Sequence, residues 1–161
     1  YGISKLNGEK ALLHINPKNS IIIRTSWLYS EFGSNFVKTM LRLSSEKEQI
    51  SVVSDQIGSP TYAKDLAEAI LQIIPKIASE DTQIYHYANK GQCSWFDFAS
   101  AIMKIAQQNC IILPITSADF KTKVKRPKYS LMNTNKIQHT FNLEIPYWED
   151  ALEECVLKLK V

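Results

Sequence analysis

Cysteine and histidine are scarce in this chain of 161 residues, which has three of each. These residues lie far apart along the chain: Cys93, Cys110, Cys155, His14, His86 and His139. An odd number of distant cysteines argues against a disulfide framework and fits a reducing compartment such as the cytoplasm. Neither residue type shows the close spacing of zinc ligands. We therefore expect a cytoplasmic protein without a metal site.

Long hydrophobic runs and a strong excess of one charge are also absent. No apolar stretch approaches the roughly 20 residues that cross a bilayer, and no charged-then-apolar leader is seen. The formal net charge of +3 is too small to indicate nucleic-acid binding. Hydrophobic residues make up 45% of the chain, which is ordinary for a globular domain. We expect one folding unit with a sizeable core, no membrane and no nucleic-acid partner.

Glycine is sparse, and the five glycines are isolated: Gly2, Gly8, Gly33, Gly58 and Gly91. A loop that cradles the pyrophosphate of a dinucleotide needs closely spaced glycines between a strand and a helix. The sequence contains no such loop, and its first residue is Tyr1 rather than methionine. We therefore expect this chain to be the C-terminal part of a longer protein whose dinucleotide-binding loop lies upstream.

Tyr1 and Lys5 stand four residues apart at the head of a helix predicted over residues 2–15. Side chains at this spacing share one face of a helix. A neighbouring ammonium lowers the pKa of a phenol and makes it a usable general acid. The spacing by itself is common, and a surface tyrosine beside a solvated lysine is the alternative. Other motifs favour the catalytic interpretation.

These motifs follow in order along the chain. Residues 1–9 read YGISKLNGE, residues 24–29 RTSWLY, residues 35–41 NFVKTML, residues 55–61 DQIGSPT and residues 126–130 RPKYS. The first motif resembles the active-site helix of the extended short-chain dehydrogenase/reductases. Together they resemble the dTDP-4-dehydrorhamnose reductases, from Tyr1 to about Trp148. The runs at 24–27 and 55–61 are the most specific.

The resemblance implies an α/β protein: the C-terminal part of a Rossmann-like short-chain dehydrogenase fold plus its small substrate-binding lobe. Residues 1 to about 30 would end the dinucleotide-binding domain, and residues from about 31 to 161 would form the lobe. The resemblance also implies the reaction and its cofactor. NADPH or NADH would reduce the C4 ketone of a dTDP-sugar, dTDP-4-dehydro-L-rhamnose.

The resemblance further assigns roles to individual residues. Tyr1 would protonate the forming alkoxide, and Lys5 would lower its pKa and bind the nicotinamide ribose. Trp27 would pack on the deoxysugar. The serine or threonine that polarises the ketone in this family would lie upstream, so neither Ser4 nor Ser26 is given that role.

Hydrophobic periodicity predicts the other elements. We expect further helices from about 36, over about 63–77, from 95 to about 108, from 133 or 134 to about 141, and after Trp148. Strands are expected at 21–23, 50–53, 83–88 and 111–113. Ser94 and Asp97 should form a capping box at the start of the helix from 95.

The helix over 63–77 carries the most detailed expectations. Ser59 or Thr61 should cap it, and Pro75 should kink or end it. Its inward face is predicted from the apolar spacing: Leu66, Ala67, Ile70, Leu71 and Ile74.

Three residues near predicted strand ends have both a structural and a functional interpretation. Trp27 follows the strand at 21–23, where ligands gather in open α/β sheets, but tryptophans also pack in cores. Asp55 is more often a turn residue that binds local backbone amides than a site carboxylate. Trp95 is expected to pack structurally rather than to line a pocket.

The basic run at 120–128 (FKTKVKRPK) is open to more than one interpretation. Such runs are usually solvated loops, and aromatic neighbours leave a carbohydrate- or RNA-binding role open. Related enzymes use a C-terminal arginine to grip the diphosphate of a sugar nucleotide, and guanidinium geometry suits that task. The resemblance makes Arg126 the candidate.

Two other functions stay open. One is a different extended sugar-nucleotide reductase, epimerase or dehydratase. The other is a non-catalytic partner protein, because the regulatory subunit of methionine adenosyltransferase also resembles these reductases. A homodimer is also left open by the sequence.

Overall fold

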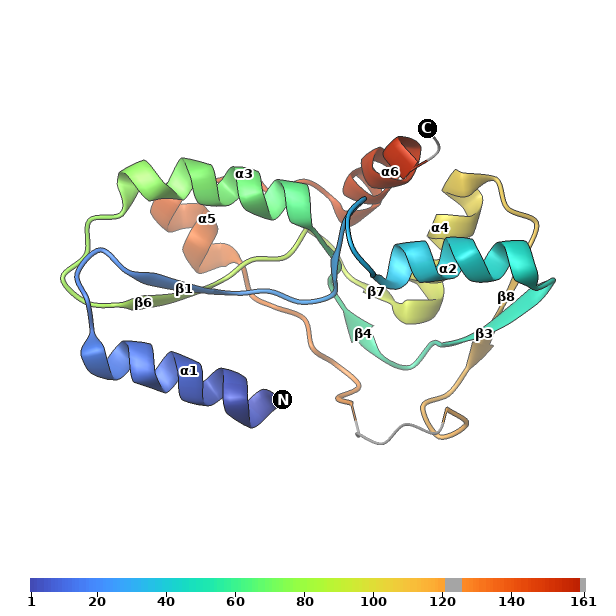
Figure 1. Cartoon of the computed structure of the whole chain (residues 1–161), viewed down its shortest axis with the longest axis horizontal. Coiled ribbons are helices and arrows are strands. Elements are labelled where there is room, and N and C mark those ends of the chain that lie inside the picture. The colour runs from blue at the N-terminus through green and yellow to red at the C-terminus, as the bar shows by residue number, and fades with distance from the viewer. Residues whose placement is uncertain (121–125, 160–161) are drawn as a thin grey trace.

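The computed structural model describes residues 1–120 and 126–159. It is an α/β structure in which two parallel strand pairs lie side by side and each carries its own helices (Figure 1). One pair joins β1 (Ile21–Arg24) to β6 (Gln83–His86), and the other joins β3 (Gln49–Val53) to β8 (Ile111–Ile115). Part of the candidate site lies between these two halves.

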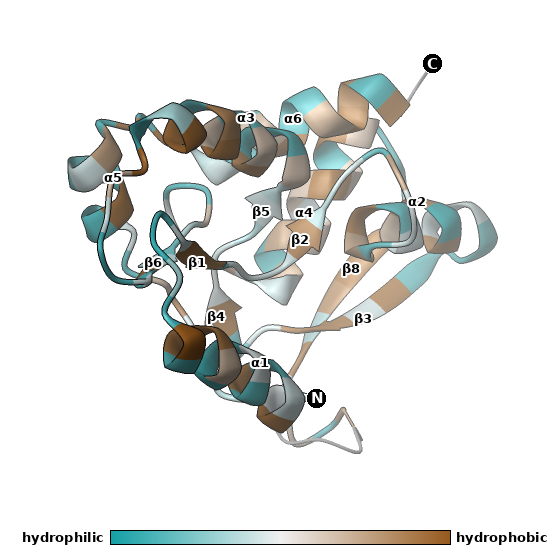
Figure 2. Ribbon diagram, turned by 60° about the vertical axis from the view of Figure 1, so that its left-hand side comes forward, coloured by the Kyte–Doolittle hydropathy of each residue, from teal (hydrophilic) through white to brown (hydrophobic). Residues whose placement is uncertain are grey.

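The β1–β6 pair has helices on both faces. In Figure 1, α3 (Ala63–Ile73) and α5 (Asn135–Phe141) lie on one side and α1 (Gly2–Ile15) on the other. β1 is a run of β-branched isoleucines, the brown strand of Figure 2, as expected for a parallel strand with helices on both faces. We call its core the β6 cluster, which comprises Ala69, Ile73, Tyr85, Tyr87, Ile137, Phe141, Leu143 and Ile145.

The β3–β8 pair carries α2 (Phe36–Glu46) and α4 (Trp95–Ala106), and α6 (Trp148–Leu159) packs on α4. The fully buried residues Val37, Phe98, Ile102, Leu152 and Val156 belong to the core of this half, which we call the α4 cluster. The chain passes repeatedly between the two clusters. The proposed division at about residue 30 is not tested by this arrangement and stays a prediction.

Two short strand pairs join the halves. β2 (Leu28–Tyr29) pairs in parallel with β5 (Thr61–Tyr62), and β4 (Ile57–Gly58) pairs antiparallel with β7 (Cys93–Ser94). Both pairs involve the motif at 55–61, which is thereby placed at the centre of the molecule.

Several predicted helix boundaries are confirmed. Ser94 and Asp97 form the reciprocal capping box of α4, and Cys93 and Phe98, which flank it, are both buried in the α4 cluster. Asn35 caps α2 by accepting a hydrogen bond from the Lys38 amide. Pro75 lies in the 3-10 turn η1 (Ile74–Lys76) that ends α3, because its ring cannot continue an α-helix.

Two expectations about α3 are wrong. No side chain caps this helix; Ser59 donates instead to the Gly91 carbonyl and Thr61 bonds Thr25. The inward face is also different, because Asp65, Ala69 and Ile73 are the buried positions. Leu66 packs on the β6 cluster as predicted, whereas four predicted inward residues are exposed: Ala67, Ile70, Leu71 and Ile74.

A buried polar group connects the start of α3 to the second half. The Asn89 amide donates to Asp65 and to the Pro146 carbonyl, and it accepts from the Tyr62 backbone N–H. Burial raises the pKa of the Asp65 carboxyl, because low-dielectric surroundings disfavour its charged form. Asn89 thereby ties α3, β5 and the segment before α6 to one point.

The attachment of α1 is mainly polar. None of its residues is buried, and Ile3 and Ile15 are 77% and 72% exposed. Glu9 accepts two hydrogen bonds from the Arg24 guanidinium at the end of β1, at 2.8 and 2.5 Å. This pairing holds the pKa of the Glu9 carboxyl below its usual value.

Candidate functional site

Two neighbouring cavities form the candidate site: one lies where the two halves meet, and the other lies within the β3–β8 half. The first, which we call the Tyr1 cavity, has a volume of about 480 Å³ and is lined by Tyr1, Trp27, Gln56, Trp95, Arg126, Pro127 and Ser130. The second, the Phe36 cavity, has about 350 Å³ and is lined by Phe36, Met40, Leu43, Ile50, Ser51, Val52, Val53, Gln56, Trp95, Phe120 and Arg126. Gln56, Trp95 and Arg126 line both, so the cavities share a wall.

Tyr1 precedes α1, whose N-terminal end points toward the centre of the molecule in Figure 1. The Lys5 ammonium lies 5.6 Å from the centroid of the Tyr1 ring, so the two side chains stand together as their spacing predicts. Tyr1 is almost fully accessible to solvent, with 96% of the residue exposed. This geometry places an accessible phenol beside a cation at the edge of the Tyr1 cavity.

Trp27 has an unusual backbone and a stacked side chain. Its φ of 47° lies in the left-handed region, which bulky residues rarely adopt. Its ring stacks on Trp95 with centroids 3.7 Å apart and planes 17° apart. One face of the Trp27 indole is therefore covered by another aromatic ring, so only its remaining face and edges can meet a ligand.

The segment around Trp27 is braced by the motif at 55–61. Ser26 donates to the Ser59 carbonyl at 2.8 Å, and the Thr61 amide donates to the Trp27 carbonyl at 3.2 Å. Gly58 approaches the indole so closely that an added Cβ would lie 2.7 Å from Trp27 Cζ2. These contacts explain why a bulky residue can hold a left-handed conformation here: the surroundings over-determine it.

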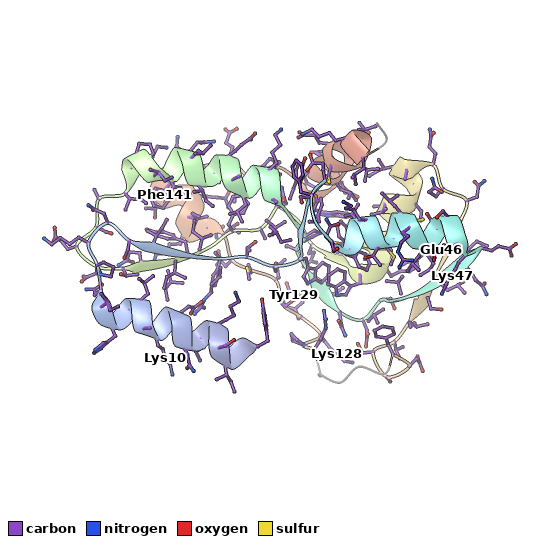
Figure 3. All side chains as sticks on the ribbon, viewed as in Figure 1. Lys10, Glu46, Lys47, Lys128, Tyr129 and Phe141 are labelled. Atoms are coloured by element: carbon purple, nitrogen blue, oxygen red, sulfur yellow. The ribbon has the colours of Figure 1, made fainter. Side chains whose placement is uncertain are left out.

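Arg126 is exposed and lies on the wall shared by both cavities. The rest of the basic run before it, residues 121–125, lies outside the described residues. Figure 3 labels Lys128 and Tyr129, which follow Pro127 on the same segment. The Ile57 amide donates to the Lys128 carbonyl and the Ser130 amide to the Ile57 carbonyl, so this segment is tied to β4.

Asp55 lies beside the shared wall. Its Oδ1 accepts hydrogen bonds from the Ser117 amide and hydroxyl at 2.8 and 2.6 Å. The bond from the Ser117 hydroxyl lowers the pKa of the Asp55 carboxyl. Asp55 does bind a backbone amide, but the expectation of a local turn is wrong, since this amide belongs to another part of the chain.

The structure brings together three of the residues singled out from the sequence, Tyr1, Trp27 and Arg126. It also adds residues that sequence reasoning missed. Trp95 packs on the α4 cluster, as expected, and it also lines both cavities. Gln56 was visible only as part of the DQIGSPT motif at 55–61, and Ser130 as part of RPKYS; neither side chain gave a signal of its own.

Two searches of the described residues complete the picture. Within residues 1–120 and 126–159, no helix is both long enough and apolar enough to span a membrane. Across the same ranges, His, Cys, Asp and Glu side chains form no cluster of three or more that could hold a metal ion.

Comparisons with known proteins identify relatives of this chain. The chain is 44% identical over 162 residues to a dTDP-4-dehydrorhamnose reductase of Aggregatibacter actinomycetemcomitans, a match that covers 95% of this chain and 55% of the relative. It is 46% identical to the spore coat polysaccharide biosynthesis protein SpsK of Bacillus subtilis, covering 96% of this chain and 52% of that protein. The chain thus spans about half the length of the curated relatives it matches.

Solved structures show the same relationship. The crystal structure of dTDP-4-dehydrorhamnose reductase from Bacillus anthracis in complex with NADP superposes with a TM-score of 0.88 at 44% identity, over 98% of this chain and 54% of that one. The expected α/β, Rossmann-like fold class is thereby confirmed. A family model described as the RmlD substrate binding domain matches residues 1–161. The chain therefore belongs to the RmlD substrate-binding domain family.

Proposed function

We propose that this chain is part of a dTDP-4-dehydrorhamnose reductase, which reduces the C4 ketone of dTDP-4-dehydro-L-rhamnose with NADPH or NADH and yields dTDP-L-rhamnose. The observation that carries this proposal is the lining of the Tyr1 cavity. Tyr1, Trp27 and Arg126 come from three distant parts of the chain and line one cavity. The names of its relatives support the same activity.

The two cavities suit the two ends of a sugar nucleotide. Their volumes of about 480 and 350 Å³ fall in the range of small-molecule sites. The hexose would lie in the Tyr1 cavity, and the thymine base would enter the largely apolar Phe36 cavity. Arg126, on the shared wall, would bind the diphosphate, which a guanidinium can grip through two parallel hydrogen bonds.

The proposed chemistry assigns a role to each residue at the Tyr1 cavity. The nicotinamide cofactor supplies the hydride when it is bound. The Tyr1 hydroxyl donates its proton to the alkoxide that forms at C4, and Lys5 stabilises the resulting phenolate. Both side chains are exposed, so a nicotinamide ribose can reach them. Trp27 packs on the deoxysugar with the part of its indole that Trp95 leaves uncovered.

The hydroxyls of Ser4 and Ser26, the serines near these residues, already donate hydrogen bonds to backbone carbonyls. Ser4 donates to the Tyr1 carbonyl and Ser26 to the Ser59 carbonyl. This supports the view that the group polarising the ketone comes from another part of a longer protein. Within the described residues β1 pairs only with β6, and Ile3 and Ile15 of α1 are exposed, so a further domain could cover both.

The decisive experiment measures NADPH oxidation by the full-length protein with dTDP-4-dehydro-L-rhamnose. We expect turnover, and we expect Tyr1→Phe to lower kcat about 10²- to 10⁴-fold, the usual contribution of a positioned acid. Tyr129→Phe is the matched control, because Tyr129 is also exposed but lines neither cavity. Equal rates for wild type and Tyr1→Phe would contradict the proposal.

The 161-residue chain alone should show no turnover, because the loop that binds the cofactor phosphates is not in its sequence. Turnover by the isolated chain would overturn that prediction. Reduction of another nucleotide sugar in preference would favour a different extended reductase. Binding of a synthetase partner without any ketosugar reduction would favour a regulatory subunit.

The remaining proposals concern cell biology and assembly. We place the protein in the cytoplasm on the grounds of its three free cysteines, all buried. A nucleotide sugar, rather than nucleic acid, is the proposed partner of the basic run, and a homodimer stays a prediction. Gel filtration with light scattering on the full-length protein would test the last point.

A further inference from the structure

Gln56 lies on the wall shared by the two cavities, and the proposed function gives it no task. It is half-buried, and its amide group is hydrogen-bonded to Ser117, which follows β8. A side-chain amide has a donor end and an acceptor end, and which end meets a ligand decides what it can bind. The neighbours of Gln56 settle that choice.

A chain of hydrogen bonds runs from Asp55 through Ser117 to Gln56. Asp55 Oδ1 is 2.6 Å from the Ser117 hydroxyl, and Gln56 Nε2 is 2.9 Å from that same hydroxyl. An ionised carboxylate can only accept, so the Ser117 hydroxyl gives its proton to Asp55 and must accept from the Gln56 amide. The lowered pKa of Asp55 keeps the carboxylate ionised at neutral pH.

Because Gln56 Nε2 donates to Ser117, the Gln56 Oε1 atom is left to accept a hydrogen bond. Nε2 is committed to Ser117, and none of the described residues donates to Oε1. We infer that Gln56 is a ligand-binding residue whose Oε1 accepts a hydrogen bond from a neutral donor group of the nucleotide sugar, and that Ser117 is the positioning residue that sets this orientation. The inference rests on the proposed function and adds a polar contact beside Arg126.

Two kinds of neutral donor group occur in such a ligand. One is the imide N–H of the thymine base, and the other is a hydroxyl of the deoxyribose or of the hexose. Both present the same chemistry to an amide oxygen, a neutral N–H or O–H. A ligand without the hexose separates the hexose hydroxyls from the donors of the nucleoside.

The test is a calorimetric titration of the full-length protein with dTDP and with dTDP-L-rhamnose. Gln56→Met keeps the length of the side chain and removes both polar ends. We expect it to raise Kd about 3- to 10-fold, the usual effect of one lost hydrogen bond to a neutral group. Equal weakening for both ligands assigns the donor to the nucleoside, whereas weakening for dTDP-L-rhamnose alone assigns it to the hexose. Gln72→Met, on the exposed side of α3, is the matched control.

The role of Ser117 is tested by a double-mutant cycle. Ser117→Ala should raise Kd about 2- to 5-fold by freeing the amide to turn, and Ser117→Thr, which keeps the hydroxyl, should restore affinity. Added to Gln56→Met, Ser117→Ala should have no further effect, because residues that act through one another are not additive. A structural role for Ser117 would make the two effects add.

Other outcomes overturn the inference or the function separately. If Gln56→Met binds both ligands as tightly as wild type while Arg126→Ala binds them weakly, the inference fails and the proposed function stands. If the wild-type protein binds neither ligand, the proposed function fails, and the inference fails with it.

Discussion

The indole rings of Trp27 and Trp95 stack with their centroids 3.7 Å apart, although 68 positions separate the two residues in the sequence (95 − 27). Trp27 holds a left-handed backbone conformation, which costs of the order of 1–3 kcal/mol. Stacking of an aromatic pair stabilises the fold by about 0.5–1.5 kcal/mol beyond the effect of its buried area. The hydrogen bonds around Trp27 add to this stabilisation. The position of Trp27 is thus set by its neighbours rather than by its own backbone preference.

Replacing Trp95 should release Trp27. We expect Trp95→Leu to abolish the far-UV circular-dichroism couplet that two stacked indoles produce, and to lower the free energy of unfolding by about 1–3 kcal/mol. In the full-length protein KM for the sugar nucleotide should rise more than kcat falls. Trp148→Phe is the control, because Trp148 packs on Phe98 and leaves the stacked pair intact. A couplet that survives in Trp95→Leu would contradict its assignment to the stacked pair of Trp27 and Trp95.

Gly58→Ala should also disturb the Trp27 indole, because Gly58 lies against that ring. Its new Cβ would stand 2.7 Å from Trp27 Cζ2, and the β4 backbone has little room to move. We expect a loss of about 1–3 kcal/mol in the free energy of unfolding, the usual cost of overpacking, together with a weaker couplet. Gly8→Ala is the matched control: nothing lies within 4 Å of its Cβ, and in mid-helix it should stabilise α1 by about 0.5–1 kcal/mol. Equal effects of the two alanines would refute this argument.

The attachment of α1 should depend on Glu9. Since this helix buries none of its residues, Glu9→Gln removes much of what holds it to β1, and amide hydrogen exchange across α1 should accelerate. Tyr1 would then be held less firmly relative to Trp27. Glu46→Gln, which breaks an exposed pair with Arg42 within α2, should leave exchange in α1 unchanged. Unaltered protection of α1 in Glu9→Gln would show that other contacts hold it.

Asp65 makes a predictable contribution to the pH dependence of stability. Burial raises its pKa in the folded protein above the ordinary value of about 3.9, so the native state binds this proton more tightly than the unfolded state. The corresponding stability is present below pH about 3.9 and is lost as pH rises through the folded pKa. The stability of Asp65→Asn relative to wild type should therefore increase with pH across that window.

Chemical denaturation at a series of acidic to neutral pH values measures this effect. A constant difference between Asp65→Asn and wild type at every pH would show that Asp65 titrates alike in the folded and unfolded states.

Local sequence patterns predicted much of the secondary structure. The capping box of α4, the end of α3 at Pro75 and the pairing of Tyr1 with Lys5 involve residues only a few positions apart, so short-range geometry is enough to specify them. The family resemblance lay in motifs that could be read directly, and the comparisons confirmed it. The buried face of α3 was predicted wrongly. Its apolar residues cover one broad arc of the helix, and the structure buries only the edge of that arc with Ala69 and Ile73, beside Asp65, because that edge faces the β6 cluster.

By itself, the sequence of this protein determined where most helices and strands form, and which phenol and ammonium stand together, because these depend on backbone geometry and neighbouring side chains. Only the tertiary structure decided that Trp95 covers one face of Trp27 and that Ser117 joins Asp55 to Gln56. Such contacts join segments more than 60 residues apart. Ser117 reaches Asp55 and Gln56 because β3 and β8 pair in parallel and end side by side, and Trp27 meets Trp95 where both pack on the α4 cluster.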